Sequence, residues 1–254
     1  MNVTETPLRK HLEELRKRLI ISVAAVVVAM AVAFVFHERI IRLLLRPSEL
    51  EAAADGGAGL IFVEVTEMLA VTMKVSLLSG LVLAFPVVLF QVIMFVAPGL
   101  TSREKRYVFA FMPGVVLAFA AGVAFGYFVM IPPAIRFLVG WGSDIATPMI
   151  RIGNYVNVVV TLLFWLGVVF ETPVVMFLLA KLRIVSWRGF ARWRRYWVVV
   201  SFILGALITP TFDPLNQGLV AVPLILLYEL GIWLARLAVR PGSSTYPEAT
   251  AEGG

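Results

Sequence analysis

Three carboxylates stand out in a chain that is otherwise mostly apolar. Glu14 and Glu104 each lie among Lys and Arg residues, whereas Glu171 lies inside a long apolar run. A carboxylate is a natural bidentate receptor for a guanidinium group. An ionisable side chain deep in a membrane is costly, and is therefore a functional candidate by default. The sequence thus offers two candidate cation receptors and one candidate intramembrane acid.

Each candidate receptor also has a local structural explanation. Lys10 and Arg18 both lie four residues from Glu14, so either can form a helical ion pair with it. Thr101 and Glu104 have the spacing of a capping box at a helix start. Local physics alone favours these structural roles. The receptor hypothesis depends on both carboxylates lying at the same face of a membrane.

The acidic residues inside apolar runs are ambiguous in the same way. Glu171 is expected near the middle of a span, where it is either functional or a protonated packing residue supported by Thr172 and Pro173. Glu229 lies seven residues before Arg236, close enough to the interface that we expect a structural ion pair or hydrogen bond.

Several classes of chemistry are disfavoured by what the sequence contains. The chain has no cysteine, which excludes disulfides and thiolate metal sites. Its histidines, His11 and His37, are expected outside the membrane, so no buried histidine nucleophile or metal site can be built. No Gly-rich phosphate loop is present. We expect neither an enzyme nor a bound cofactor.

The composition indicates a polytopic membrane protein. Apolar residues make up 60% of the chain, charged residues 15%, and the mean hydropathy is +0.92. The net charge of +6 is better explained by cytoplasmic loops than by nucleic-acid binding. We expect an all-α integral membrane protein with six transmembrane helices in one bundle. The expected spans are 19–36, 68–97, 107–131, 154–180, 196–209 and 217–235.

Turn signals and helix lengths add detail to this picture. Pro132 and Pro133 are expected to end the third span, and Asn154 to cap the fourth. The fifth span would be only ~21 Å long. The alternative is that the basic residues 193–195 also belong to the fifth helix and snorkel towards the interface. The sixth span is also short. The segment 37–67 is expected to be an outer loop with a surface helix.

We expect residues 1–240 to form a single membrane domain. An amphipathic surface helix over about 7–18 precedes the first span, with Leu8, Leu12, Leu15 and Leu19 on one side. Residues 241–254 have the composition of a disordered tail. Most of the 22 Lys and Arg residues fall on one side of the six spans, which places both termini in the cytoplasm.

Motifs along the chain resemble those of the TatC family, the large membrane subunit of the twin-arginine protein translocase, over about residues 7–240. Any one of these motifs alone is weak evidence for the family, but their joint presence at the right spans is strong evidence. They are Glu14-Leu15-Arg16, then Gln91, Phe95 and Ala97-Pro98, then Arg103-Glu104-Lys105-Arg106, Phe170-Glu171-Thr172-Pro173, and Thr209-Pro210 with Asp213 and Gln217. One departure, the acidic Glu13, leaves open whether Glu13 or Glu14 engages a ligand.

The resemblance implies a receptor for twin-arginine signal peptides of folded export substrates, in a bacterial or archaeal cytoplasmic membrane. By match, Glu14 and Glu104 would accept the two arginines, with Arg16, Phe95 and Pro98 shaping the site. The implied partners are the single-span TatA and TatB proteins, membrane lipid and further copies of the chain. The positions implied to meet TatA and TatB are Thr209 and Gln217. Energy would come from the proton-motive force.

A secondary solute transporter that uses Glu171 is the alternative hypothesis. Such a carrier usually shows repeat symmetry and broken helices around a midplane site, and no internal repeat is visible in this sequence. A peptide with Arg-Arg, compared with the same peptide carrying Lys-Lys, distinguishes the two hypotheses, because a transporter should ignore the exchange.

Overall fold

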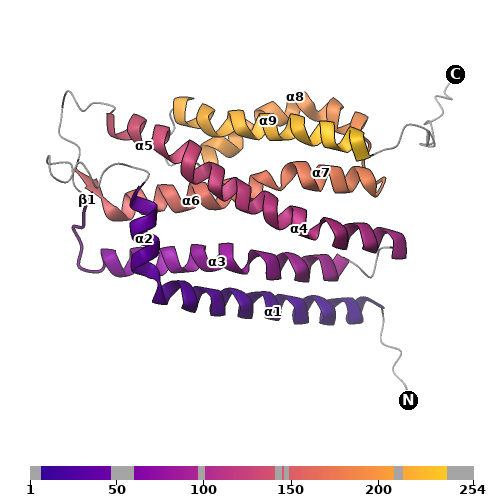
Figure 1. The fold of residues 1–254 in the computed structure, drawn as a ribbon, viewed down its shortest axis with the longest axis horizontal. Coiled ribbons are helices and arrows are strands. Elements are labelled where there is room, and N and C mark those ends of the chain that lie inside the picture. Colours follow the sequence, from indigo (N-terminus) through magenta and orange to yellow (C-terminus); the bar gives the residue numbers. More distant parts are fainter. Residues whose placement is uncertain are drawn as a thin grey trace, which may run out of the picture.

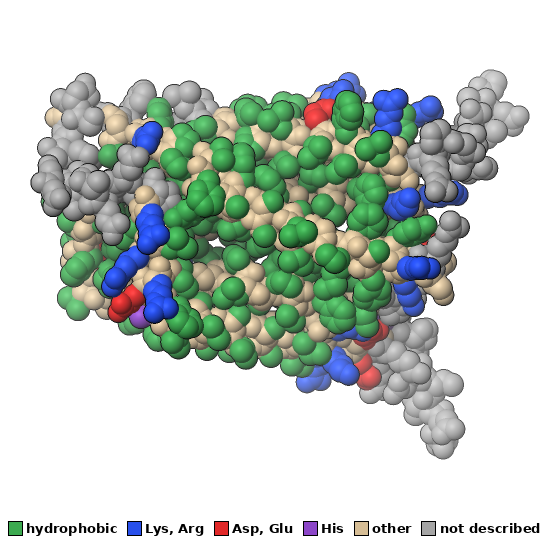
Figure 2. Space-filling model, viewed as in Figure 1, with side chains coloured by type: hydrophobic (Ala, Val, Ile, Leu, Met, Phe, Trp, Pro, Cys, Tyr) green, Lys and Arg blue, Asp and Glu red, His purple; other side chains and the backbone are tan. Residues whose placement is uncertain are grey.

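The computed structural model describes residues 7–46, 60–96, 101–140, 145, 149–208 and 214–238, without the side chains of 7–10, 96, 103 and 214–216. Long helices run side by side along one axis (Figure 1). Five of them within this part of the chain are long and apolar enough to cross a membrane. The space-filling view shows hydrophobic side chains over the middle of the molecule and charged ones towards its two ends (Figure 2).

The first helix, α1 (Pro7–Val35), packs along α3 (Glu67–Val96). Gly80 permits this close approach, since a Cβ there would lie 2.7 Å from the backbone of Met30. The predicted amphipathic segment 7–18 is helical and continues into the spanning helix without a break. Its leucines Leu12 and Leu19 are exposed, as lipid-facing residues would be.

A second, short helix, α2 (His37–Leu45), lies across the end of the bundle opposite the start of α1 (Figure 1). It buries Ile41 and Leu44 on its inner face. The hydroxyls of Tyr127 and Tyr155 donate to the carbonyls of Leu43 and Leu44, each at 2.8 Å. These bonds tie the C-terminal turn of α2 to two later helical segments, and the Leu43 carbonyl also accepts from the backbone N–H of Arg46. The helix expected in segment 37–67 is therefore present.

The next spanning element continues well past its predicted end. It comprises α4 (Ser102–Phe125), a π-helical turn η4 (Gly126–Met130) and α5 (Ile131–Gly140). The expectation that Pro132 and Pro133 end the helix is wrong. Proline has no N–H, and its ring clashes with the carbonyl four residues earlier, which here falls in the π turn. The wider π turn relieves that conflict and lets the helix continue.

The following span is divided into α6 (Ile152–Phe170) and α7 (Thr172–Lys181), with Glu171 between them. Its N-cap is Arg151 and not Asn154, which corrects the prediction. The helix starts earlier because β2 (Ile150–Arg151) pairs in parallel with β1 (Leu60–Ile61). That pairing holds the backbone extended up to Arg151.

The last two helices, α8 (Trp187–Ile208) and α9 (Pro214–Ala238), pack against each other, and α9 also packs on α7. Because α8 begins at Trp187, the basic residues 193–195 belong to the helix. Only its part from Tyr196 onward is free of charge, about 20 Å of helix. The alternative in which residues 193–195 belong to the fifth helix is therefore confirmed, and the apolar length of that helix is as short as expected.

Candidate functional site

Glu14 lies on the first part of α1 and binds Arg18 one turn further on. The Arg18 guanidinium donates to Glu14 Oε1 from Nη2 at 2.5 Å and from Nε at 3.1 Å. Its Nη1 also lies 3.5 Å from Oε1 of Gln91 on α3. The Glu14 side chain remains 30% exposed. The Glu14–Arg18 ion pair that the sequence suggested is therefore present, but the Glu14 carboxylate remains partly exposed to solvent.

A pocket of about 310 Å³ surrounds this pair and is lined by Glu13, Glu14, Lys17, Arg18 and Ile21. Glu13 thus borders the same space as Glu14.

The end of α3 approaches the start of α1 at the same place. The His11 ring stacks on Phe95 with their centroids 4.5 Å apart. Arg16 is exposed on α1. Pro98, the remaining residue predicted to shape the site, lies outside the described residues.

Glu104 closes a capping box at the start of α4. Its Oε2 accepts from the backbone N–H of Thr101 at 2.8 Å and from the Thr101 hydroxyl at 2.7 Å. The Thr101 hydroxyl oxygen in turn accepts from the Glu104 N–H at 3.4 Å. All three contacts are at the surface, so the predicted local role is present and the carboxylate remains accessible.

The starts of α1 and α4 lie at one end of the bundle, together with the end of α3 (Figure 1). This arrangement follows from the connectivity, because α3 returns the chain to the end at which α1 began. Glu14 and Glu104 are therefore carried to the same end of the molecule by separate elements. Lys and Arg side chains gather at this end as well (Figure 2).

Glu171 lies at the junction between α6 and α7. Both of its carboxylate oxygens are buried, and neither has a hydrogen-bond partner among the described residues. The interior is tightly packed beside it, since a Cβ on Gly122 of α4 would lie 2.6 Å from the carbonyl oxygen of Leu166. A buried carboxyl without a partner is unfavourable for stability. Packing alone gives no reason for an acid at this position.

The other polar residues singled out from the sequence make internal contacts. Glu229 of α9 forms an ion pair with Arg194 of α8, with 2.5 Å between Oε1 and Nε, which agrees with its predicted structural role. Gln217 donates from Nε2 to the carbonyl of Phe202 at 2.7 Å and so ties α9 to α8. Thr209 lies outside the described residues.

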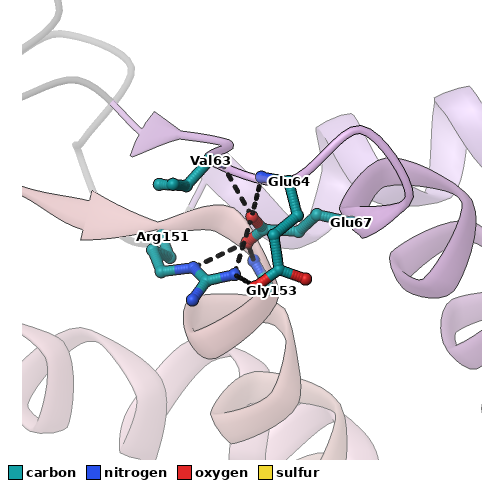
Figure 3. A network of polar contacts seen from close by, with 5 residues as sticks. All are labelled: Val63, Glu64, Glu67, Arg151 and Gly153. Carbon is teal, nitrogen blue, oxygen red and sulfur yellow. Dashed lines mark hydrogen bonds and ion pairs between the residues drawn. The ribbon is translucent and has the colours of Figure 1, made fainter.

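At the opposite end, a carboxylate clamp that the sequence did not reveal centres on Glu67 (Figure 3). Glu67 accepts from the N–H groups of Val63 at 2.9 Å and Gly153 at 3.1 Å, and from Nη2 of Arg151 at 3.1 Å. Arg151 also binds Glu64 at 2.9 Å. Its hydrogen bonds to Glu67 and then Glu64 raise the pKa of Arg151. The clamp joins the start of α3 to the start of α6.

Removing the charge of Glu67 should destabilise the fold. In Glu67→Gln, one acceptor oxygen becomes an amide donor that faces N–H groups and a guanidinium, so we expect the unfolding temperature in detergent to fall by several degrees. Glu64→Gln is the matched control, because the Glu64 side chain is 64% exposed and, among the described residues, its ion pair is with Arg151. Equal shifts in thermal unfolding for the two variants would contradict the clamp.

Among the described residues, no group of three His, Asp or Glu side chains could hold a metal ion.

Comparison with known proteins identifies the family. A family model described as Sec-independent protein translocase protein (TatC) matches residues 10–223. The Sec-independent protein translocase protein TatC of Carboxydothermus hydrogenoformans is 39% identical over 227 residues, which cover 89% of this chain and 91% of that protein. The TatC of Aquifex aeolicus is 38% identical, with 92% of this chain and 96% of that protein covered.

A solved structure agrees with these sequences. The crystal structure of a twin-arginine translocase receptor, TatC, is similar with a TM-score of 0.80 and 38% identity, covering 91% of this chain and 100% of that one. The predicted fold class, an all-α integral membrane protein, is confirmed. All the relatives named here are translocase proteins, so the solute-transporter alternative has no support. The chain belongs to the TatC family and is a core membrane subunit of the Sec-independent protein translocase.

Proposed function

We propose that this chain is the receptor for twin-arginine signal peptides, with Glu14 and Glu104 accepting the two guanidinium groups. The observation that carries the proposal is the placement of two accessible carboxylates, from α1 and from the start of α4, at one end of the bundle. By the distribution of Lys and Arg, this end is the cytoplasmic one and both termini lie there.

Each carboxylate keeps one oxygen for a ligand. Arg18 occupies only Oε1 of Glu14, and Thr101 occupies only Oε2 of Glu104, within the part of the chain that the structure describes. An ionised carboxylate has about four acceptor sites over its two oxygens. A peptide arginine can therefore bind without first breaking the helix cap or the pair within α1.

Neighbouring residues support the same role. Gln91 lies close enough to Arg18 to hold its guanidinium if the peptide displaces it from Glu14. The stacked His11 and Phe95 fix the start of α1 against the end of α3, which keeps Glu14 in place. In this proposal Arg16 and Pro98 border the bound peptide.

Translocation requires partners and an energy source. We assign the contacts with the single-span subunits TatA and TatB to Thr209 and Gln217, and the energy to the proton-motive force. Gln217 is engaged with Phe202 in the isolated chain, so a polar group of a partner helix would compete for that amide. Glu171 acts after peptide binding in this scheme, and further copies of the chain complete the complex.

Exchanging the ligand's arginines tests the receptor function. The full-length protein in detergent should bind a labelled signal peptide with Arg-Arg at least about tenfold more tightly than the same peptide with Lys-Lys, because lysine cannot form bidentate pairs with a carboxylate. Fluorescence anisotropy measures both affinities. The Lys-Lys peptide keeps the net charge and is the matched control. Equal affinities would reject the receptor function.

A further inference from the structure

An apolar pocket of about 480 Å³ opens between α2, α3, α4 and α6. Figure 2 shows this face hollowed beside α2. The walls carry aliphatic and aromatic side chains, among them Leu43, Leu78, Val82, Phe85 and Val123. The hydroxyl of Tyr127, which also borders the pocket, is already donated to the carbonyl of Leu43. The pocket therefore suits hydrocarbon and offers little to a polar ligand.

The helix that closes one side of this pocket is basic on its outer face. Arg39, Arg42 and Arg46 of α2 and its C-cap are all exposed. Arg42 has a weak contact with Glu38, at 3.4 Å between two side chains that are more than 70% exposed. Arg39 lies over the ring of Phe36. Neither Arg39 nor Arg46 forms an ion pair with another described residue, so within the described part of the chain these three guanidiniums share one carboxylate partner, Glu38.

We propose that this pocket is a binding site for an anionic phospholipid, whose acyl chain fills the apolar space and whose phosphate binds the arginines of α2. The amphipathic α2 lies across the end of the bundle, and an amphipathic helix in that place suits the level where headgroups meet acyl chains. Basic residues beside a crevice between spanning helices are typical of anionic lipid sites. The leaflet is the one opposite the end that carries Glu14 and Glu104.

The size and charge of the site favour a lipid over a helix of another protein. A helix is about 10 Å across, so 480 Å³ would admit only roughly one turn of it. A flexible acyl chain can fill the same space completely. The arginines belong to the helix that lines one side of the pocket with Ile40, Leu43 and Leu44, and a phosphodiester supplies the negative charge that would pair with them. This inference does not depend on peptide recognition at the opposite end.

Native mass spectrometry of the detergent-solubilised full-length protein tests the proposal. The probe is an equimolar mixture of phosphatidylglycerol and phosphatidylcholine with the same acyl chains. We expect the wild type to retain phosphatidylglycerol several-fold more than phosphatidylcholine. The triple variant R39Q/R42Q/R46Q should lose this preference. The variant A124F, which fills the pocket from α4, should retain less of both lipids.

The matched control is R188Q/R192Q/R195Q, which removes three exposed arginines from α8. It should keep the preference, because α8 does not line the pocket. Equal retention of both lipids by the wild type would overturn the proposal, and so would an unchanged preference in R39Q/R42Q/R46Q. Normal retention by A124F would show a phosphate bound on α2 without a chain in the pocket. Displacement of the lipid by free inorganic phosphate would also contradict an acyl-chain site.

Discussion

Charge reversal at Glu104, in the variant Glu104→Lys, is expected to abolish binding of a twin-arginine peptide while leaving the membrane fold intact. The carboxylate lies at the surface, where Oε2 takes part in the capping box of α4 and Oε1 has no hydrogen bond to a described residue. A lysine would repel both guanidinium groups of the peptide and could not accept a hydrogen bond. Peptide affinity by fluorescence anisotropy and helix content by circular dichroism measure the two outcomes.

Two further variants separate the capping role of Glu104 from its charge. Glu104→Gln keeps a residue that can complete a capping box but removes the charge, so binding should weaken at least about tenfold. Thr101→Ala removes the cap partner but keeps the carboxylate, at a cost of about 1 kcal/mol in stability. Its affinity should stay near that of the wild type. If Glu104→Gln binds normally and Thr101→Ala does not, Glu104 is only a capping residue.

The second large effect is expected from Glu171→Gln, which should bind the peptide normally but lose at least about nine-tenths of its export activity. Glutamine is nearly isosteric with glutamic acid but cannot ionise or exchange a proton. Because the Glu171 carboxyl has no partner among the described residues, the unfolding temperature of the variant should be unchanged or higher. Export of a twin-arginine reporter, peptide affinity and thermal unfolding should all be measured.

This pattern distinguishes function from packing. A packing role predicts a lower unfolding temperature together with reduced export. Normal export by a stable Glu171→Gln protein would return the residue to a structural role. Glu229→Gln is a suitable comparison, because Glu229 is paired with Arg194 and should affect stability more than export.

The features that could be predicted well from the sequence depend on long apolar runs or on the spacing of residues along one helix. The positions of the long helices follow from hydrophobic length. The Glu14–Arg18 pair and the Thr101–Glu104 capping box follow from fixed offsets on a helix. The same offsets could not decide whether these carboxylates also serve a ligand, because that depends on where separate helices begin in space.

The predictions that failed depended on contacts between distant segments. Pro132 signals a helix end unless a π turn precedes it, and no residue pattern announced that turn. Asn154 would be a good cap, but pairing between β1 and β2 moved the helix start to Arg151. The Glu67 clamp joins residues more than eighty positions apart. Its one signal in the sequence is an acidic residue directly before one predicted span and an arginine three residues before another.

The most direct measurement of the central claim is site-specific photocrosslinking from positions 14 and 104 to one twin-arginine signal peptide. Photoreactive residues at both positions should crosslink to the peptide close to its arginine pair, and exchange of that pair for lysines should reduce both crosslinks together. A crosslinker at exposed Glu38, at the other end of the bundle, is the control and should give none. Crosslinks from only one of the two positions, or yields unaffected by the lysine exchange, would contradict recognition by paired carboxylates.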